Sequence, residues 1–146
     1  MSVSLTYYSS AAVPSSVLSQ ISSHAGSLTH RWWAEGMVFF PDPEDRGRAY
    51  GDTKLFLLST DPEDDSAMAW RDASFITTQL EAWSAAHGIV WVISCEGNTV
   101  GQVSGGIRDS DMGDFLASLL QIAELSSPVT PERLAAIDLQ HADRWD

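Results

Sequence analysis

The residues of this 146-residue chain with the clearest chemical potential are carboxylates in two similar short stretches. Asp42-Pro43-Glu44-Asp45 and Asp61-Pro62-Glu63-Asp64 each follow an apolar run, and Asp65 extends the second stretch. Clustered carboxylates either bind a divalent cation or attract a positively charged protein. In a calcium loop that starts at Asp42, the fifth position is Arg46 and the twelfth is Thr53, where a carboxylate should complete the coordination. We therefore expect no metal site and no cofactor.

The direction of the two preceding apolar runs decides whether these stretches can act together. If the runs pair as an antiparallel hairpin, their ends lie at opposite edges of the sheet, and the stretches form no common site. A single carboxylate cluster requires parallel strands.

Other catalytic patterns are incomplete, so the sequence identifies no catalytic residue. Gly101 and Gly106 have the spacing of a phosphate-binding loop, but Ile107-Arg108 occupies the place of the required Lys-Ser or Lys-Thr. The four histidines belong to no His-Glu-x-x-His motif, and the serines form no Gly-x-Ser-x-Gly motif. Cys95 ends an apolar run and is expected to be a buried, unreactive thiol.

Trp32 and Trp33 are the most unusual adjacent pair. On a strand their side chains point to opposite faces, which leaves one ring exposed as an anchor for a partner. The alternative is that the core covers one ring and a C-terminal helix covers the other.

The elements that must position these residues follow from hydrophobic periodicity and from turn residues. The expected strands are an alternating run at residues 3–7, apolar runs at 37–40, 55–58 and 89–93, and a final strand at 99–108. The expected helices begin at Pro14, at Asp65 or Ser66, at Asp111 and at Thr130-Pro131. This order predicts a single α+β domain over residues 1–146, with an antiparallel or mixed sheet of about five strands and helices on one face. Its β-α-β-β-α-β part is that of a ferredoxin-like split sheet.

Charge excludes several classes of partner. The formal net charge is −12, from 20 acidic and 8 basic residues. Residues 42–72 contribute −5 and residues 109–146 contribute −6. Nucleic acid and anionic membranes are therefore repelled, and a cationic protein is attracted. A single cysteine, no signal-peptide pattern and no long apolar run place the chain in the cytoplasm.

These features predict a non-catalytic module that binds a basic protein. In size, charge and lack of active-site motifs the chain resembles small acidic immunity or inhibitor proteins of bacterial toxins. The expected steering residues are Asp42, Glu44, Asp45, Asp61, Glu63, Asp64 and Asp65, with Trp32 or Trp33 as the anchor. One alternative is a small-ligand-binding protein or enzyme with a carboxylate and histidine pocket beside the glycine-containing strand. Another is a homodimer formed through the apolar C-terminal helices.

Overall fold

One antiparallel sheet organises the chain. The computed structural model describes residues 3–56 and 62–140, and within them six strands pair in the order β2-β3-β1-β4-β5-β6. The strands are β1 (Val3–Ser9), β2 (Val38–Phe39), β3 (Tyr50–Phe56), β4 (Trp91–Cys95), β5 (Asn98–Ser104) and β6 (Ile107–Arg108). Because β3 lies between β1 and β2, the first four strands have the predicted split arrangement. The α+β class is confirmed.

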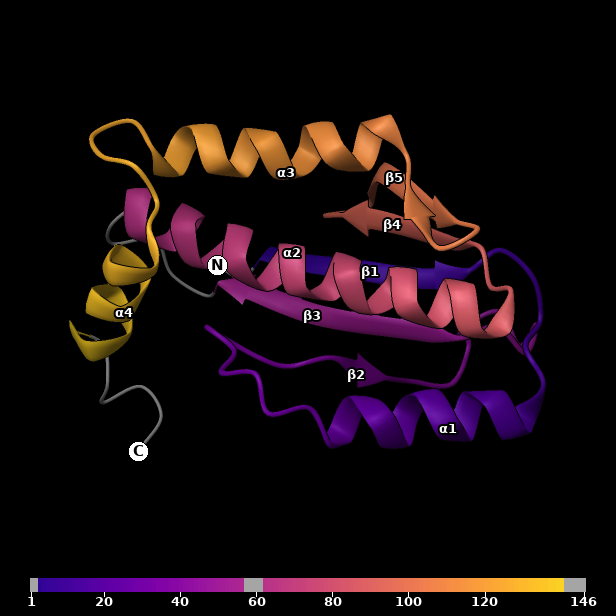
Figure 1. Ribbon diagram of the computed structural model, residues 1–146. Coiled ribbons are helices and arrows are strands. Elements are labelled where there is room, and N and C mark those ends of the chain that lie inside the picture. The colour runs from indigo at the N-terminus through magenta and orange to yellow at the C-terminus, as the bar shows by residue number, and fades with distance from the viewer. Residues whose placement is uncertain (1–2, 57–61, 141–146) are drawn as a thin grey trace.

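The helices cover one face of this sheet (Figure 1). They are α1 (Ser15–Gly26), α2 (Pro62–His87), α3 (Ser110–Ala123) and α4 (Pro131–Gln140). The long helix α2 crosses the middle of the sheet, with α1 beside β2 and α3 beside β5 (Figure 1). The short helix α4 stands at the end of this layer, next to the first turns of α2 (Figure 1). None of the helices in the described ranges combines the length and hydropathy that crossing a lipid bilayer requires.

Alternation along β1 explains how one sheet face becomes the core. Leu5 and Tyr7 are fully buried under the helices, whereas Thr6 and Tyr8 on the opposite face are half-buried. Tyr7 pairs with Gly51 across the sheet, and a Cβ on that glycine would overlap the Tyr7 ring. The strand therefore needs glycine at this position because the aromatic side chain fills the space above it.

Aromatic rings form the centre of the main core. Phe39 lies 5.7 Å from Tyr7 and 5.8 Å from Trp83, measured between ring centroids. Trp83 lies 6.2 Å from Trp91. These edge-on and tilted contacts join three strands to α2.

The glycine-rich segment at 99–108 differs from the single strand that was expected. It is a hairpin, in which β5 turns back into β6 through Gly105 and Gly106, whose φ angles are 61° and 80°. Positive φ at both central residues suits the right-handed twist of a two-residue hairpin. Gly101 has a different role, because a Cβ there would lie 2.6 Å from the backbone nitrogen of Met112 at the start of α3.

Several element boundaries were also wrong. β3 begins at Tyr50, inside the segment expected to be a loop, and residues 57 and 58 lie outside the described part. Helix α2 begins at Pro62, so neither Asp65 nor Ser66 is its cap. Helix α3 is capped by Asp109, which accepts a hydrogen bond from Met112 N–H at 2.8 Å. The expected strand at 89–93 is observed two residues later.

Candidate functional site

In the first acidic stretch, the Asp42 carboxylate binds neighbouring groups of the same loop. The carboxylate of Asp42 accepts hydrogen bonds from Arg48 Nε at 2.9 Å and Nη2 at 3.0 Å, and its side chain is only 2% exposed. The backbone N–H groups of Glu44, Arg46 and Arg48 also donate to it. The Arg48 guanidinium and these N–H groups hold the pKa of Asp42 well below its usual range. Asp42 therefore fixes the loop and presents little charge to a partner.

The other two acidic residues of this stretch stay accessible. Glu44 is exposed and lies 3.1 Å from Arg46 Nε, in a solvated ion pair. Asp45 is exposed, with a left-handed backbone at φ 55°. Exposed pairs of this kind contribute little to stability, because water screens both charges. Part of the predicted steering charge is therefore present at this loop.

The described residues of the second stretch, Glu63, Asp64 and Asp65, contact other parts of the chain near α4. Glu63 and Asp64 each lie 3.9 Å from Arg133 Nη2. Asp65 is only 5% exposed and accepts a hydrogen bond from Trp33 Nε1 at 3.2 Å. Asp61 lies outside the described residues.

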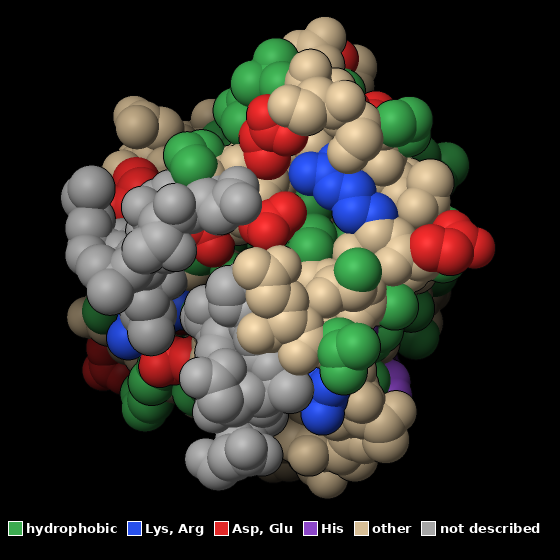
Figure 2. Space-filling model, turned by 90° about the vertical axis from the view of Figure 1, so that its left-hand side faces the viewer, with side chains coloured by type: hydrophobic (Ala, Val, Ile, Leu, Met, Phe, Trp, Pro, Cys, Tyr) green, Lys and Arg blue, Asp and Glu red, His purple; other side chains and the backbone are tan. Residues whose placement is uncertain are grey.

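The described members of the two stretches lie apart. Because β2 and β3 pair antiparallel, the end of β2 that leads into the first stretch and the last described residue of β3 lie at opposite ends of the pair. Glu63 and Asp64 contact Arg133, whereas Asp42 and Glu44 contact Arg48 and Arg46. Figure 2 views the end of the molecule where α4 lies, and on it acidic and basic side chains are interspersed with hydrophobic ones. The described side chains that are visible on this face form no continuous acidic patch.

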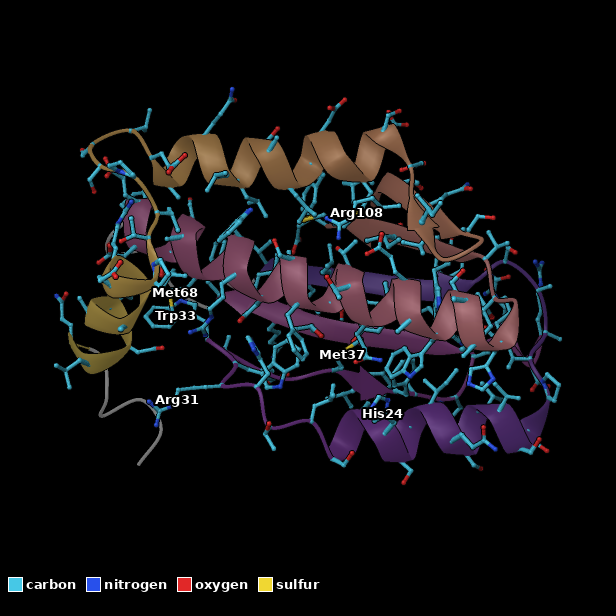
Figure 3. All side chains as sticks on the ribbon, viewed as in Figure 1. His24, Arg31, Trp33, Met37, Met68 and Arg108 are labelled. Carbon is cyan, nitrogen blue, oxygen red and sulfur yellow. The ribbon has the colours of Figure 1, made fainter. Side chains whose placement is uncertain are left out.

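Trp32 and Trp33 are in a segment between α1 and β2 that is neither helix nor strand. The expectation of opposite faces on a strand was therefore wrong. Trp33 is 2% exposed and packs with Met68 and Ile137, beneath α4 (Figure 3). Trp32 is half-buried against the main core, with its ring centroid 4.5 Å from that of His30. A C-terminal helix therefore covers Trp33, as in the alternative interpretation, whereas the core covers Trp32 only in part.

Among the exposed acidic residues that the predicted site did not include, three lie at the start of α3. Asp109, Asp111 and Asp114 are all exposed, and none of them forms an ion pair with a side chain in the described ranges. The charge of −6 over residues 109–146 was the available signal. Periodicity could not separate an exposed charge from a paired one.

The distribution of basic side chains explains why some acidic residues are paired and those at the start of α3 are not. In the described ranges, at least six basic side chains lie no farther than 3.9 Å from a carboxylate of the same chain. They are Arg46, Arg48, Lys54, Arg71, Arg108 and Arg133. Arg108, which adjoins the acidic residues of α3 in sequence, turns toward α2 and binds Glu81 at 2.9 Å (Figure 3). This contact lowers the pKa of Glu81 and removes the nearest cation in sequence from the α3 surface.

A histidine and a carboxylate do meet, but in the core packing of α2. His30 Nε2 lies 2.8 Å from Asp72 Oδ1, and the fully buried Asp72 carboxylate also binds Trp33 N–H at 2.8 Å and Arg71 Nε at 3.3 Å. The His30 ring stacks on Phe75 with the centroids 4.2 Å apart. This cluster joins the segment before β2 to α2.

A cavity formed by described residues lies elsewhere. It has a volume of about 280 Å³ between the end of β1, the start of α1 and the connection from α2 to β4. Serine and small apolar residues line most of it, together with His87, and no carboxylate contributes. The alternative function requires a pocket lined by a histidine and a carboxylate. This cavity does not provide that combination.

Two further groups bear on chemistry. The Cys95 thiol is half-buried, and burial together with the nearby Glu96 raises its pKa, which favours the neutral thiol. In the described ranges, no three His, Cys, Asp or Glu residues are grouped so that they could hold a metal ion.

No known relative supplies a function by comparison. No family model matches the chain, and no curated protein or solved structure matches it significantly. The fold and the site together define an α+β protein with helices on one face and exposed, uncompensated carboxylates at the start of α3.

Proposed function

We propose that this protein is a non-catalytic, cytoplasmic module that binds a basic protein, in the manner of an immunity or inhibitor protein of a bacterial toxin. The observation that supports the proposal best is the division of charge. Most basic side chains are occupied by the chain's own carboxylates, so the surplus of negative charge falls on exposed acidic residues. Such a surplus accelerates encounter with a positively charged protein.

The steering surface of this proposal contains the start of α3 and the exposed part of the β2–β3 loop. Asp111 and Asp114 provide the α3 part, and Asp45 provides the loop part, because Arg46 and Arg48 lie beside Glu44. Asp42 and Asp65 act inside the fold, as their burial and hydrogen bonds indicate. The buried Trp33 supports the segment before β2, and it does not serve as the anchor.

The test is capture followed by kinetics. We expect the immobilised protein to retain a basic protein from an extract of its own source cells at low salt. Against that purified protein, the variant Asp111→Asn/Asp114→Asn should associate about threefold to tenfold more slowly at low salt, and the difference should fade as salt rises. The variant Ser22→Lys/Ser23→Lys is the matched control, because it changes the net charge equally at two exposed positions of α1. Equal slowing in both variants, or capture of acidic proteins alone, contradicts the proposal.

A further inference from the structure

The two faces of the sheet differ in what covers them. All helices of the described ranges lie on the face that carries Leu5 and Tyr7 (Figure 1). The opposite face, which we call the outer face, consists of the side chains that alternate with the core residues along each strand. It carries Thr6 and Tyr8 of β1, Val38 of β2, Tyr50, Asp52 and Lys54 of β3, and Val92 of β4. Antiparallel sheets often expose one face to water, so a site on this face needs further evidence.

Tyr8 and Tyr50 lie side by side on two inner strands of the outer face. They pair in register, and their rings stack with the centroids 6.3 Å apart. Val92 pairs with Tyr8 from the other neighbouring strand, and Val38, which is 42% exposed, lies beyond β3 on β2. Aromatic and β-branched side chains therefore extend across four neighbouring strands. Tyrosine is enriched at the centres of protein interfaces, where its ring provides contact area and its hydroxyl a hydrogen bond.

Asp52 is a half-buried carboxylate within this surface, and it forms no ion pair with a side chain of the described ranges. Thr6 Oγ1 donates a hydrogen bond to Asp52 Oδ1 at 3.2 Å. Lys54 lies two residues farther along the same strand, but its Nζ binds Glu35 Oε1 at 3.4 Å. Burial, the largest cause, raises the pKa of Asp52 above its usual value, although the hydrogen bond from Thr6 and the charge of Lys54 act in the opposite direction. The Asp52 carboxylate is thus partly desolvated, and no cation of the described chain fully compensates it.

A neighbouring contact shows how this protein holds a guanidinium group. Arg48 Cζ lies 5.0 Å from the centroid of the Tyr8 ring, and the same guanidinium binds the Asp42 carboxylate. An aromatic ring and a carboxylate suit arginine together, because its planar group is weakly hydrated, stacks on rings and donates several hydrogen bonds. Asp52 and Tyr50, two residues apart on the same face of β3, offer the same two groups, and no described arginine contacts Asp52.

We propose that the outer face around Asp52 is the docking surface for the basic partner, which places an arginine side chain against the Asp52 carboxylate beside the Tyr50 ring. This arginine compensates the desolvated carboxylate, as Arg48 does for Asp42 within the chain. The inference rests on the proposed function, since it assigns the surface on which that same basic partner is held.

The steering residues and the docking surface have separate roles. Asp111 and Asp114 attract a cationic protein through water, over about 8 Å at physiological salt and farther at low salt, so they need not touch the docked partner. A second copy of this chain is disfavoured as the occupant of the outer face. The cations near this face, Lys54 and Arg48, already bind carboxylates of their own chain, so two copies would bring two Asp52 carboxylates together without supplying an arginine.

The first experiment asks whether Asp52 selects a guanidinium group. The isotope-labelled full chain is titrated with N-acetylarginine methylamide and, separately, with the uncharged analogue N-acetylcitrulline methylamide, and amide chemical shifts are recorded by NMR. We expect the arginine probe to shift the amides around Thr6, Tyr50 and Asp52 and to bind about threefold to tenfold more tightly than the citrulline probe. Asp52→Asn should remove this preference. Glu132→Gln, which removes one exposed carboxylate from α4, should retain it.

The second experiment measures the kinetics of the basic protein captured in the test of the proposed function. Asp52→Asn should speed its dissociation by about tenfold and leave association within about twofold, because a contact charge acts after encounter. Asp111→Asn/Asp114→Asn should instead slow association. Tyr50→Ala keeps the carboxylate and should also speed dissociation, so it decides the question if circular dichroism shows that Asp52→Asn does not fold. Glu132→Gln should change neither rate.

The remaining outcomes separate failure of this surface from failure of the proposed function. Unchanged dissociation of the captured protein from both outer-face variants overturns the docking surface and leaves the basic partner in place. Equal binding of the two probes, or shifts confined to the start of α3, overturns the role of Asp52. Failure to capture any basic protein overturns the proposed function and the docking surface with it. A partner-free protein that sediments as a dimer with protected amides on β1 and β3 assigns the outer face to a second copy.

Discussion

The loop between β2 and β3 and the start of α3 carry similar acidic residues, but the fold uses them differently. In the loop, the Asp42 carboxylate is enclosed by Arg48 and by three backbone N–H groups. At α3, Asp111 and Asp114 point outward and pair with no described cation. The comparison teaches that the supply of arginine decides which carboxylates hold the fold together and which remain for a partner.

The largest expected effect is on an internal carboxylate. Asp72→Ala removes the partner of His30, Arg71 and the Trp33 N–H together, and should lower the free energy of unfolding by about 3–5 kcal/mol. Urea unfolding monitored by tryptophan fluorescence measures this change. The control Asp114→Ala should stay within about 0.5 kcal/mol of the wild type. Similar losses in the two variants would remove the distinction between internal and external carboxylates.

A smaller effect is expected where a tryptophan meets the second acidic stretch. Trp33→Phe keeps most of the buried ring but loses the Nε1–H bond to Asp65, and should cost about 1–3 kcal/mol. The double variant Trp33→Phe/Asp65→Leu tests the cause. If its unfolding free energy recovers relative to Trp33→Phe alone, the loss came from the hydrogen bond that the buried Asp65 carboxylate no longer accepts. If it does not recover, the loss came from packing.

The next prediction concerns pH. The pKa of Asp42 is lower in the folded protein than in the unfolded chain, so its contribution is present above the unfolded pKa and is lost as pH falls through the folded pKa. Asp42→Asn should therefore be less stable than the wild type at neutral pH, and the two unfolding curves should approach each other below about pH 4. In an Arg48→Gln background the difference at neutral pH should shrink. A constant gap at every pH contradicts the ion-pair explanation.

The smallest effect on stability is expected at the start of α3. Asp111→Asn/Asp114→Asn should change the unfolding free energy by no more than about 0.5–1 kcal/mol, because the residues are exposed and lose only a favourable interaction with the helix N-terminus. Thermal melting at low and high salt measures this change. A large loss of unfolding free energy would show that these carboxylates stabilise the fold, as Asp42 does in the loop between β2 and β3.

Much of the fold could be predicted because its signals are local. The alternation at Val3–Ser9, the periodicity of α2 and the Thr130-Pro131 start of α4 each depend on neighbours in sequence. The hairpin at Gly105 and Gly106 was missed, because glycine in a strand indicates either a turn or a close approach, and only the position of Met112 distinguishes them.

The candidate site was less predictable, because exposure depends on distant partners. Asp42 and Asp45 are three positions apart, yet one side chain is nearly enclosed and the other is exposed. Trp33 is covered by Ile137, which lies more than a hundred residues later on α4. No local pattern encodes such a contact.

The sequence by itself determined the α+β order of elements, the acidic surplus and the scarcity of cations, since these follow from residue types and their spacing. Only the tertiary structure decided which acidic residues the few arginines neutralise and which strands pair side by side. The physical reason is that an ion pair or a strand pairing forms over a few ångströms in space, between residues that chain folding alone brings within reach.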